Sequence, residues 1–265
     1  MKTMNVWYKL LVFFPIWLFF SMVFYAIVFI LYPKAFSGSK TEFDILISTN
    51  YAFLFLSQLA ALLGILASIL FISKYIEKEK PRIFKNMFHL EGILYGIILG
   101  FVLIMIVLLI ISMLYKSQIT FNKLGIDILW YTIIFFCVAI SEEIMSRGFI
   151  FVNLYNNSNK HLAIIISSII FSLLHSFNSS FNIIGMINIL LIGILLCIMY
   201  LKNMNLSIPI GFHFIWNLLQ GPIWGFSVSG LNTSSMFEIT NTGNDGFPFS
   251  DFGLEGSLIS TIVLG

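Results

Sequence analysis

Long apolar stretches, separated by short polar segments, run along most of the chain. They lie near 8–32, 51–75, 92–115, 125–152, 162–177, 182–201 and 206–226. Because crossing the hydrocarbon core of a bilayer takes about 20 apolar residues, each stretch predicts a transmembrane helix. A last run, Ser257 to Leu264, is too short to span, so it either lies at the interface or begins an eighth helix. The pattern predicts an all-α, polytopic bundle of about seven transmembrane helices, with eight left open.

Composition agrees with lipid as the main solvent of the chain. Of 265 residues, 59% are hydrophobic and only 10% are charged, whereas soluble domains carry about 25% charged residues. The net charge of +2 is too small to argue for a nucleic-acid partner. Cys137 and Cys197 lie in apolar runs and are interpreted as core residues rather than as a disulfide. The bilayer is therefore the first expected partner.

The distribution of Lys and Arg predicts how the chain crosses the membrane. The richest cluster lies between the second and third apolar stretches, at Lys74, Lys78, Lys80, Arg82 and Lys85. Placing this cluster in the cytoplasm leaves four of the 14 basic residues outside, in agreement with the positive-inside rule. The frequent Ile, Asn, Lys and Phe resemble the bias of a bacterial genome. We therefore expect a bacterial plasma-membrane protein with a cytoplasmic N-terminus.

Three segments follow from this topology. Residues 1–90 hold the first helices and the basic cytoplasmic loop, and residues 91–226 hold the helices with intramembrane polar groups. Residues 227–265 are expected to form a flexible outer-side loop and the short terminal apolar segment.

Charged side chains stand together inside one apolar stretch, at Glu142, Glu143 and Arg147. Each charge at membrane depth costs at least about 2.5–3.5 kcal/mol, so such residues usually have a function or a partner. Glu143 and Arg147 are four residues apart and share a helix face, which predicts an ion pair. Glu142 points about 100° away from Glu143. It therefore faces another part of the bundle and is a candidate general base.

Further polar residues lie in two later helices. His175 follows an apolar run, and His213 and Asn217 are four residues apart within another. His89 and His161 stand beside loops and are interpreted as interfacial residues. The topology puts Glu142 and His213 in the cytoplasmic half of the membrane and His175 deeper. Each residue alone could serve helix packing, whereas their combination on three helices favours a shared site.

Three motifs in this order resemble a known family. Glu142-Glu143-Ile144-Met145-Ser146-Arg147 is similar to an EExxxR motif, Phe171-Ser172-Leu173-Leu174-His175 to FxxxH, and His213-Phe214-Ile215-Trp216-Asn217 to HxxxN. The resemblance is to the CPBP (CAAX protease and bacteriocin-processing, Abi) intramembrane proteases. It covers roughly 125–225 and makes 91–226 the expected catalytic domain.

The resemblance implies hydrolysis of a peptide bond within the membrane. Glu142 would activate water beside His175, and Glu143 and Arg147 would form a supporting pair. His213 and Asn217 would stabilise the oxyanion. The implied partner is a peptide or membrane-protein substrate, such as the leader of a bacteriocin or pheromone.

The need for a metal is left open by the motifs. Glu142, His175 and His213 form a permissible set of zinc ligands, as expected of a metalloprotease. The sequence has no HExxH motif, and we favour a metal-free glutamate mechanism. Alternative functions are a proton-coupled transporter, which would use similar intramembrane residues, and a non-catalytic immunity or scaffold protein of the same family.

Overall fold

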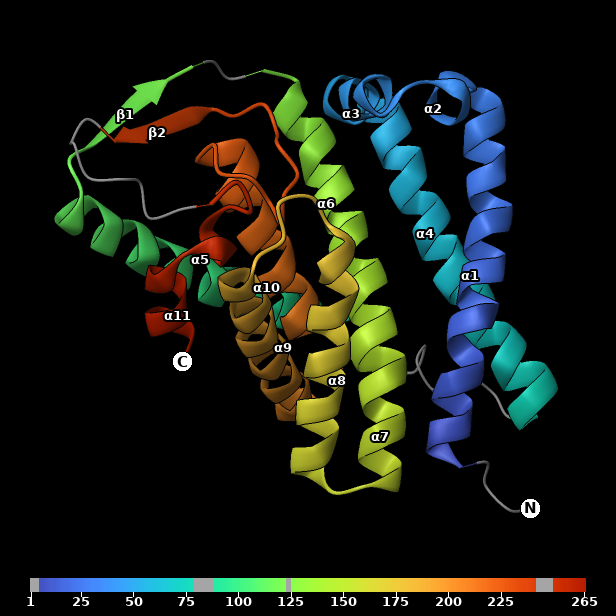
Figure 1. Cartoon of the computed structure of the whole chain (residues 1–265). Coiled ribbons are helices and arrows are strands. Elements are labelled where there is room, and N and C mark those ends of the chain that lie inside the picture. The colour runs from blue at the N-terminus through green and yellow to red at the C-terminus, as the bar shows by residue number, and fades with distance from the viewer. Residues whose placement is uncertain (1–4, 79–87, 123–124, 242–249) are drawn as a thin grey trace.

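A computed structural model describes residues 5–78, 88–122, 125–241 and 250–265 (Figure 1). Several basic residues that predicted the topology, namely Lys2, Lys80, Arg82, Lys85 and Lys123, lie outside these ranges. The N-terminal elements are α1 (Val6–Leu31), α2 (Lys34–Ser37), α3 (Lys40–Thr49), α4 (Tyr51–Phe71) and the π-helix η1 (Ile72–Glu77). α1 packs along α4, and the short helices α2 and α3 join them at one end (Figure 1).

The remaining helices form the larger part of the bundle. They are α5 (Leu90–Leu114), α6 (Asp127–Glu143) with the π-helix η3 (Ile144–Phe151) and α7 (Val152–Asn157), α8 (Lys160–Leu174) with the 3₁₀ turn η4 (His175–Phe177), α9 (Ile183–Asn203), α10 (Ser207–Leu218) with the π-helix η5 (Leu219–Ile223), the 3₁₀ turn η6 (Leu254–Gly256) and α11 (Leu258–Leu264). Helix-starting side chains such as Asn159 and Asn182 accept hydrogen bonds from backbone N–H groups of the first turns, which satisfies donors that the helix itself leaves free.

Among the described residues, six helical runs are long and apolar enough to cross a membrane. They correspond to the first six predicted stretches, so the all-α transmembrane bundle is confirmed. The seventh stretch is also helical but short, because α10 has 12 residues and η5 adds 5. The terminal run forms α11, whose 7 residues are too few to span.

Close backbone contact between α5 and α10 fixes the helix that carries His213. Gly92, Gly96 and Gly100 repeat every four residues on the side of α5 that meets α10. A Cβ atom on Gly96 would lie 2.2 Å from the carbonyl oxygen of Ile208, and one on Gly211 would lie 2.1 Å from that of Ile93. Small residues at such positions let helices approach closely in lipid. The two helices are therefore held in one register.

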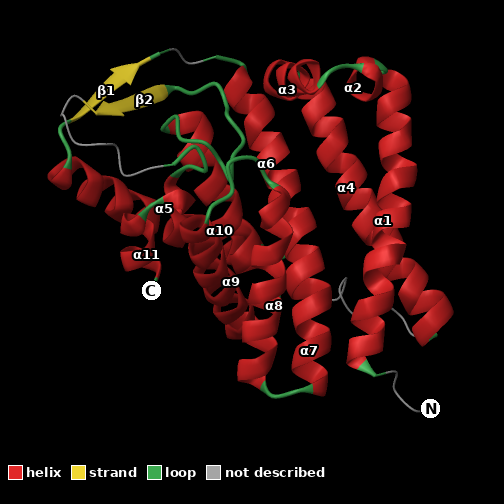
Figure 2. Cartoon of the chain, viewed as in Figure 1, coloured by secondary structure: helices red, strands yellow, loops and turns green. Residues whose placement is uncertain are grey.

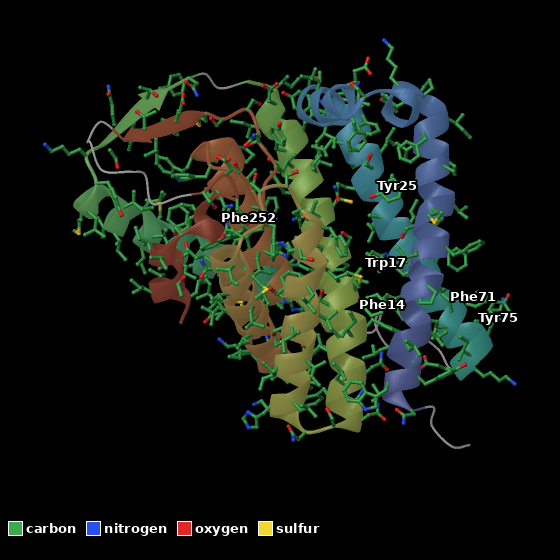
Figure 3. All side chains as sticks on the ribbon, viewed as in Figure 1. Phe14, Trp17, Tyr25, Phe71, Tyr75 and Phe252 are labelled. Atoms are coloured by element: carbon green, nitrogen blue, oxygen red, sulfur yellow. The ribbon has the colours of Figure 1, made fainter. Side chains whose placement is uncertain are left out.

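The segment after η5 folds back over the bundle. Its strand β2 (Phe237–Asn241) pairs antiparallel with β1 (Ser117–Phe121), with Ile119 opposite Ile239. This two-stranded sheet lies at the same end of the bundle as α3 (Figure 2). Phe252, which Figure 3 labels, is fully buried. Its ring packs edge-on against that of Phe181, with ring centroids 5.8 Å apart. The expectation of a flexible loop over 227–256 is therefore wrong for these described parts, because apolar side chains anchor them; Asp245 lies outside the described residues.

Candidate active site

A change of helix type separates the two glutamates from the residues that follow. α6 ends at Glu143, and the chain continues as the π-helix η3. The N–H of Ile144 is shared between the carbonyl oxygens of Ile140 and Ser141. π-helical turns are rare and occur frequently at functional sites. The EExxxR segment lies across this change.

Arg147 and Glu143 form a buried ion pair at the centre of the bundle. Arg147 Nη1 donates to Glu143 Oε1 at 2.8 Å, and Nη2 donates to the carbonyl oxygen of Gly193 at 3.2 Å. Both side chains are almost fully buried. The guanidinium also lies 4.2 Å from the centre of the Phe171 ring, a favourable cation–π contact. These contacts hold Glu143 on the side predicted from the four-residue spacing.

The same Glu143 oxygen contacts His213 of α10. His213 Nδ1 lies 2.9 Å from Glu143 Oε1, where the carboxylate accepts the Nδ1–H. A carboxylate on one ring nitrogen fixes the orientation of an imidazole and favours its charged form. His213 Nε2 then points to Glu142, 3.8 Å from its Oε2.

His175 approaches Glu142 from the end of α8. Its Nδ1 lies 2.8 Å from the carbonyl oxygen of Phe171, to which it donates. This bond leaves Nε2 as an acceptor, and Nε2 lies 3.6 Å from Glu142 Oε2. Two imidazole nitrogens from separate helices therefore flank one carboxylate oxygen.

The depths of these residues agree better than the sequence indicated. The helical run that begins with α6 extends from Asp127 to Asn157, and Glu142 lies midway along it. His175 follows the last residue of α8, Leu174. His213 lies in the second turn of α10. Because Glu142 Oε2 lies 3.6 Å from His175 Nε2 and 3.8 Å from His213 Nε2, the predicted gap in depth between His175 and the other two residues is closed.

One pocket of about 980 Å³ collects these groups. Glu142, His175, His213 and Asn217 all line it, together with apolar side chains that include Trp216. Asn217 follows His213 by one helical turn and is nearly buried. Glu142 Oε2 is a buried carboxylate oxygen without a hydrogen-bond donor among the described residues. Glu143 and Arg147 are not among the described residues that line the pocket.

Glu255 is a pocket residue that the sequence analysis missed. It lies in η6, is 3% exposed and lines the same pocket. Its Oε2 accepts from the backbone N–H of Ser229 at 2.9 Å and from the Ser229 hydroxyl at 2.7 Å. Burial raises the pKa of this carboxyl, while the bonds from Ser229 act in the opposite direction. No motif marks Glu255, because it stands in a polar segment that resembles a surface loop.

The arrangement does not form a ready metal site. Among the described residues, no group of three or more His, Cys, Asp or Glu side chains is arranged to hold a metal ion. His213 Nδ1 contacts Glu143, so the Nε2 atoms of His213 and His175 are the imidazole nitrogens that face Glu142. We therefore derive no step through zinc.

A membrane-embedded helix bundle with a carboxylate and two imidazoles in one polar pocket has the groups that a membrane hydrolase needs. Residues 124–219 match the family described as type II CAAX prenyl endopeptidase Rce1-like. This segment carries the three motifs, and the match agrees with the predicted resemblance to the CPBP/Abi family and with a CAAX-type protease integral to the membrane. No curated protein and no solved structure matched the chain. The match contains all six predicted site residues but neither Glu255 nor α1–α5.

Proposed function

We propose that this protein is an intramembrane endopeptidase that hydrolyses a peptide bond with water activated by Glu142. The observation that carries the proposal is the position of Glu142 Oε2, 3.6 Å from His175 Nε2 and 3.8 Å from His213 Nε2 in one pocket. A buried carboxylate oxygen that accepts no hydrogen bond from the described residues is suited to bind water. The proposed substrate is a peptide or a membrane-associated protein.

The first step needs a base for water. A water molecule about 2.8 Å from both Glu142 Oε2 and His175 Nε2 has normal hydrogen-bond geometry, since these atoms are 3.6 Å apart. Glu142 takes a proton from this water as its oxygen attacks the substrate carbonyl carbon. His175 orients the water through its acceptor nitrogen, which the bond from Nδ1–H to Phe171 holds in place.

The tetrahedral intermediate needs donors for its oxyanion. The Asn217 amide supplies a neutral N–H, and His213 supplies Nε2–H when both ring nitrogens carry protons. Glu143 favours that charged imidazole, because its Oε1 accepts from His213 Nδ1 at 2.9 Å. Arg147 holds Glu143 in position through the 2.8 Å bond. The supporting pair therefore acts through His213.

Collapse of the intermediate breaks the carbon–nitrogen bond. The proton that Glu142 took from water passes to the leaving amine, which departs neutral, and the carbonyl carbon ends as a carboxylic acid. Glu142 returns to its ionised form, so the cycle needs no other reactant. In this proposal the protein groups alone carry the proton, and zinc is not required.

Replacing Glu142 by Gln tests the base directly. The variant keeps the size of the side chain but removes its basicity, and we expect peptide cleavage to fall by at least about 10²–10⁴-fold. The measurement compares membrane-peptide fragments by mass spectrometry between cells with the wild type and cells with the variant. The matched control is Glu91→Gln at an exposed position in the first turn of α5, which should leave cleavage unchanged.

Chelation and flux measurements separate the alternatives. Purified protein treated with a zinc chelator should keep its activity, and a loss restored by zinc would replace the metal-free mechanism with a metal-dependent one. Equal fragment patterns in cells with the wild type and cells with the Glu142→Gln variant, combined with proton-driven solute flux in liposomes, would instead support a carrier. Equal fragment patterns without flux would leave a non-catalytic immunity or scaffold role.

A further inference from the structure

We propose that substrates reach the active site from the outer side of the membrane, so that the enzyme cleaves peptides exposed or exported there rather than cytoplasmic protein tails. This inference rests on the proposed peptidase function and adds the direction from which the substrate comes. Two independent observations support it. One is where the pocket opens, and the other is where the basic residues lie.

The pocket is deep at one end and open at the other. Its deep end is formed by buried or partly buried side chains of transmembrane helices, including His213 and Phe212. Its exposed lining residues all belong to connecting segments: Ile45 in α3, Phe177 to Ser180 after α8, Asn232 after η5, and Asp251. The side chain of Phe177 is 88% exposed. The opening is therefore formed where these segments meet.

These segments all lie at the end of the bundle away from the N-terminus. α3 lies at the top in Figure 1, where β1, β2 and the start of α6 are also found. The start of α1, the end of η1 and the connection from α7 to α8 lie at the opposite end. Lys9 near the start of α1 contacts Glu77 of η1 and Asn153 of α7, which places these three segments together. The opening and the N-terminus are therefore on opposite faces.

Basic residues gather on the face with the N-terminus. Its described members are Lys9, Lys74, Lys78, Lys160 and Lys202, at or near the ends of helices on that face. The other face has Lys34, Lys40 and Lys116 in its connecting segments. Because cytoplasmic loops carry the excess of Lys and Arg, the N-terminal face is cytoplasmic and the pocket opens outward.

The lining of the pocket narrows the class of substrate. None of its described lining residues is Lys or Arg, whereas Asp251 is an exposed acid at the opening and Glu255 is a buried acid of the same pocket. Apolar walls from Ile47, Leu54 and Phe135 continue inward to Glu142. These apolar walls suit an extended peptide with apolar residues around the cleaved bond. Neutral or basic residues should be preferred over acidic ones near the opening.

Cysteine labelling tests the direction without relying on catalysis. Cys137 and Cys197 are free and buried, so the wild type sets the background for a membrane-impermeant maleimide. We expect Phe177→Cys at the opening and Ile119→Cys on β1 to react in intact spheroplasts. Tyr75→Cys in η1, where the side chain is 59% exposed, should react only after permeabilisation. The reverse pattern would overturn the inference, as would labelling of position 177 from the same side as position 75.

Sealed vesicles of both orientations then test substrate access. The probe is an impermeant quenched fluorescent peptide with an apolar centre and flanking lysines. Cleavage only in vesicles that expose the outer face supports the inference, and cleavage only in inverted vesicles rejects it. If no vesicle cleaves the probe, the labelling pattern decides. If Glu142→Gln cleaves as well as the wild type, the proposed function fails while the direction of the opening still stands.

Discussion

At the scale of single residues, Phe171 connects the three motifs. Its ring carries the Arg147 guanidinium at 4.2 Å and meets the His175 ring edge-on at 4.6 Å. The His213 ring lies 6.3 Å away at a right angle. The carbonyl oxygen of Phe171 accepts a hydrogen bond from His175 Nδ1. The first residue of the FxxxH motif therefore positions the catalytic groups without touching the substrate carbonyl in the proposed mechanism.

Replacing Phe171 by Leu should lower the turnover rate more than it weakens substrate binding. The variant keeps an apolar side chain and the backbone carbonyl but removes the aromatic face, so Arg147 loses a contact of about 0.5–2 kcal/mol. Steady-state cleavage of a fluorescent peptide in detergent would measure kcat and KM separately. Phe101→Leu, at a position on α5 that is 47% exposed, is the control. A rise in KM with unchanged kcat would contradict a positioning role.

The buried Glu255 should make stability depend on pH. Burial raises the pKa of its carboxyl above the usual 4.5, so its contribution to stability is fully present below that value. The contribution is lost as the pH rises through the higher pKa of the folded state. The side chain in Glu255→Gln stays neutral at every pH. The melting temperature of this variant should therefore rise relative to that of the wild type as the pH increases from about 4.5.

Thermal unfolding in detergent across this pH range gives the measurement. Glu238→Gln, an exposed glutamate on β2, should show no such trend. If the wild type instead gained stability relative to Glu255→Gln with rising pH, the ionised carboxylate would be the favoured form.

Most of the site was predictable from residue type and spacing, but Glu255 was not. Charged and polar residues inside apolar stretches stand out because lipid makes them unfavourable without a reason, which identified Glu142, His175 and His213. Glu255 stands in a short segment with Gly253, Gly256 and Ser257, and its burial depends on Phe252 and Leu254 packing inward. Such long-range packing has no local signal in the sequence.

At the scale of elements, the helices were predicted well and their irregular parts were not. Apolar length locates a helix but does not show where it changes to a π-helix, as at Ile144 and Leu219. The depth of His175 was misjudged for a related reason, because the rise along each helix was counted from uncertain ends. The glycines of α5 carry a signal that the sequence analysis did not use, since a four-residue repeat of small residues predicts close packing in lipid.

Adding one methyl group to α5 should therefore destabilise the protein. Alanine is the better helix former by about 1 kcal/mol, yet in Gly96→Ala the new Cβ would lie 2.2 Å from the Ile208 carbonyl oxygen. We expect a net loss of about 1–3 kcal/mol, seen as a lower melting temperature in detergent. Ile98→Ala on the same helix, where the side chain is 59% exposed, should change it little. An unchanged melting temperature for Gly96→Ala would show that α5 and α10 can separate.

At the scale of the whole molecule, the N-terminal helices contribute to the site. Leu54 and Gln58 of α4 line the pocket with residues of the later helices, and α4 packs against α6. The boundary expected near residue 90 stays a prediction, because the family match begins only at residue 124. The boundary near residue 90 divides the sequence by its composition, whereas residues from both sides of that boundary line the pocket.

Two of the helices that carry the site are short, and this has a consequence for the surrounding lipid. The run from Lys160 to Phe177 has 18 residues and rises about 27 Å, while α10 with η5 rises about 25 Å. Both fall below a hydrocarbon thickness of about 30 Å, so acyl chains beside them must compress. Peptide cleavage should therefore be fastest in vesicles of short-chain lipids and slow down as the chains lengthen. Equal rates in all of them would mean that neighbouring helices absorb the mismatch.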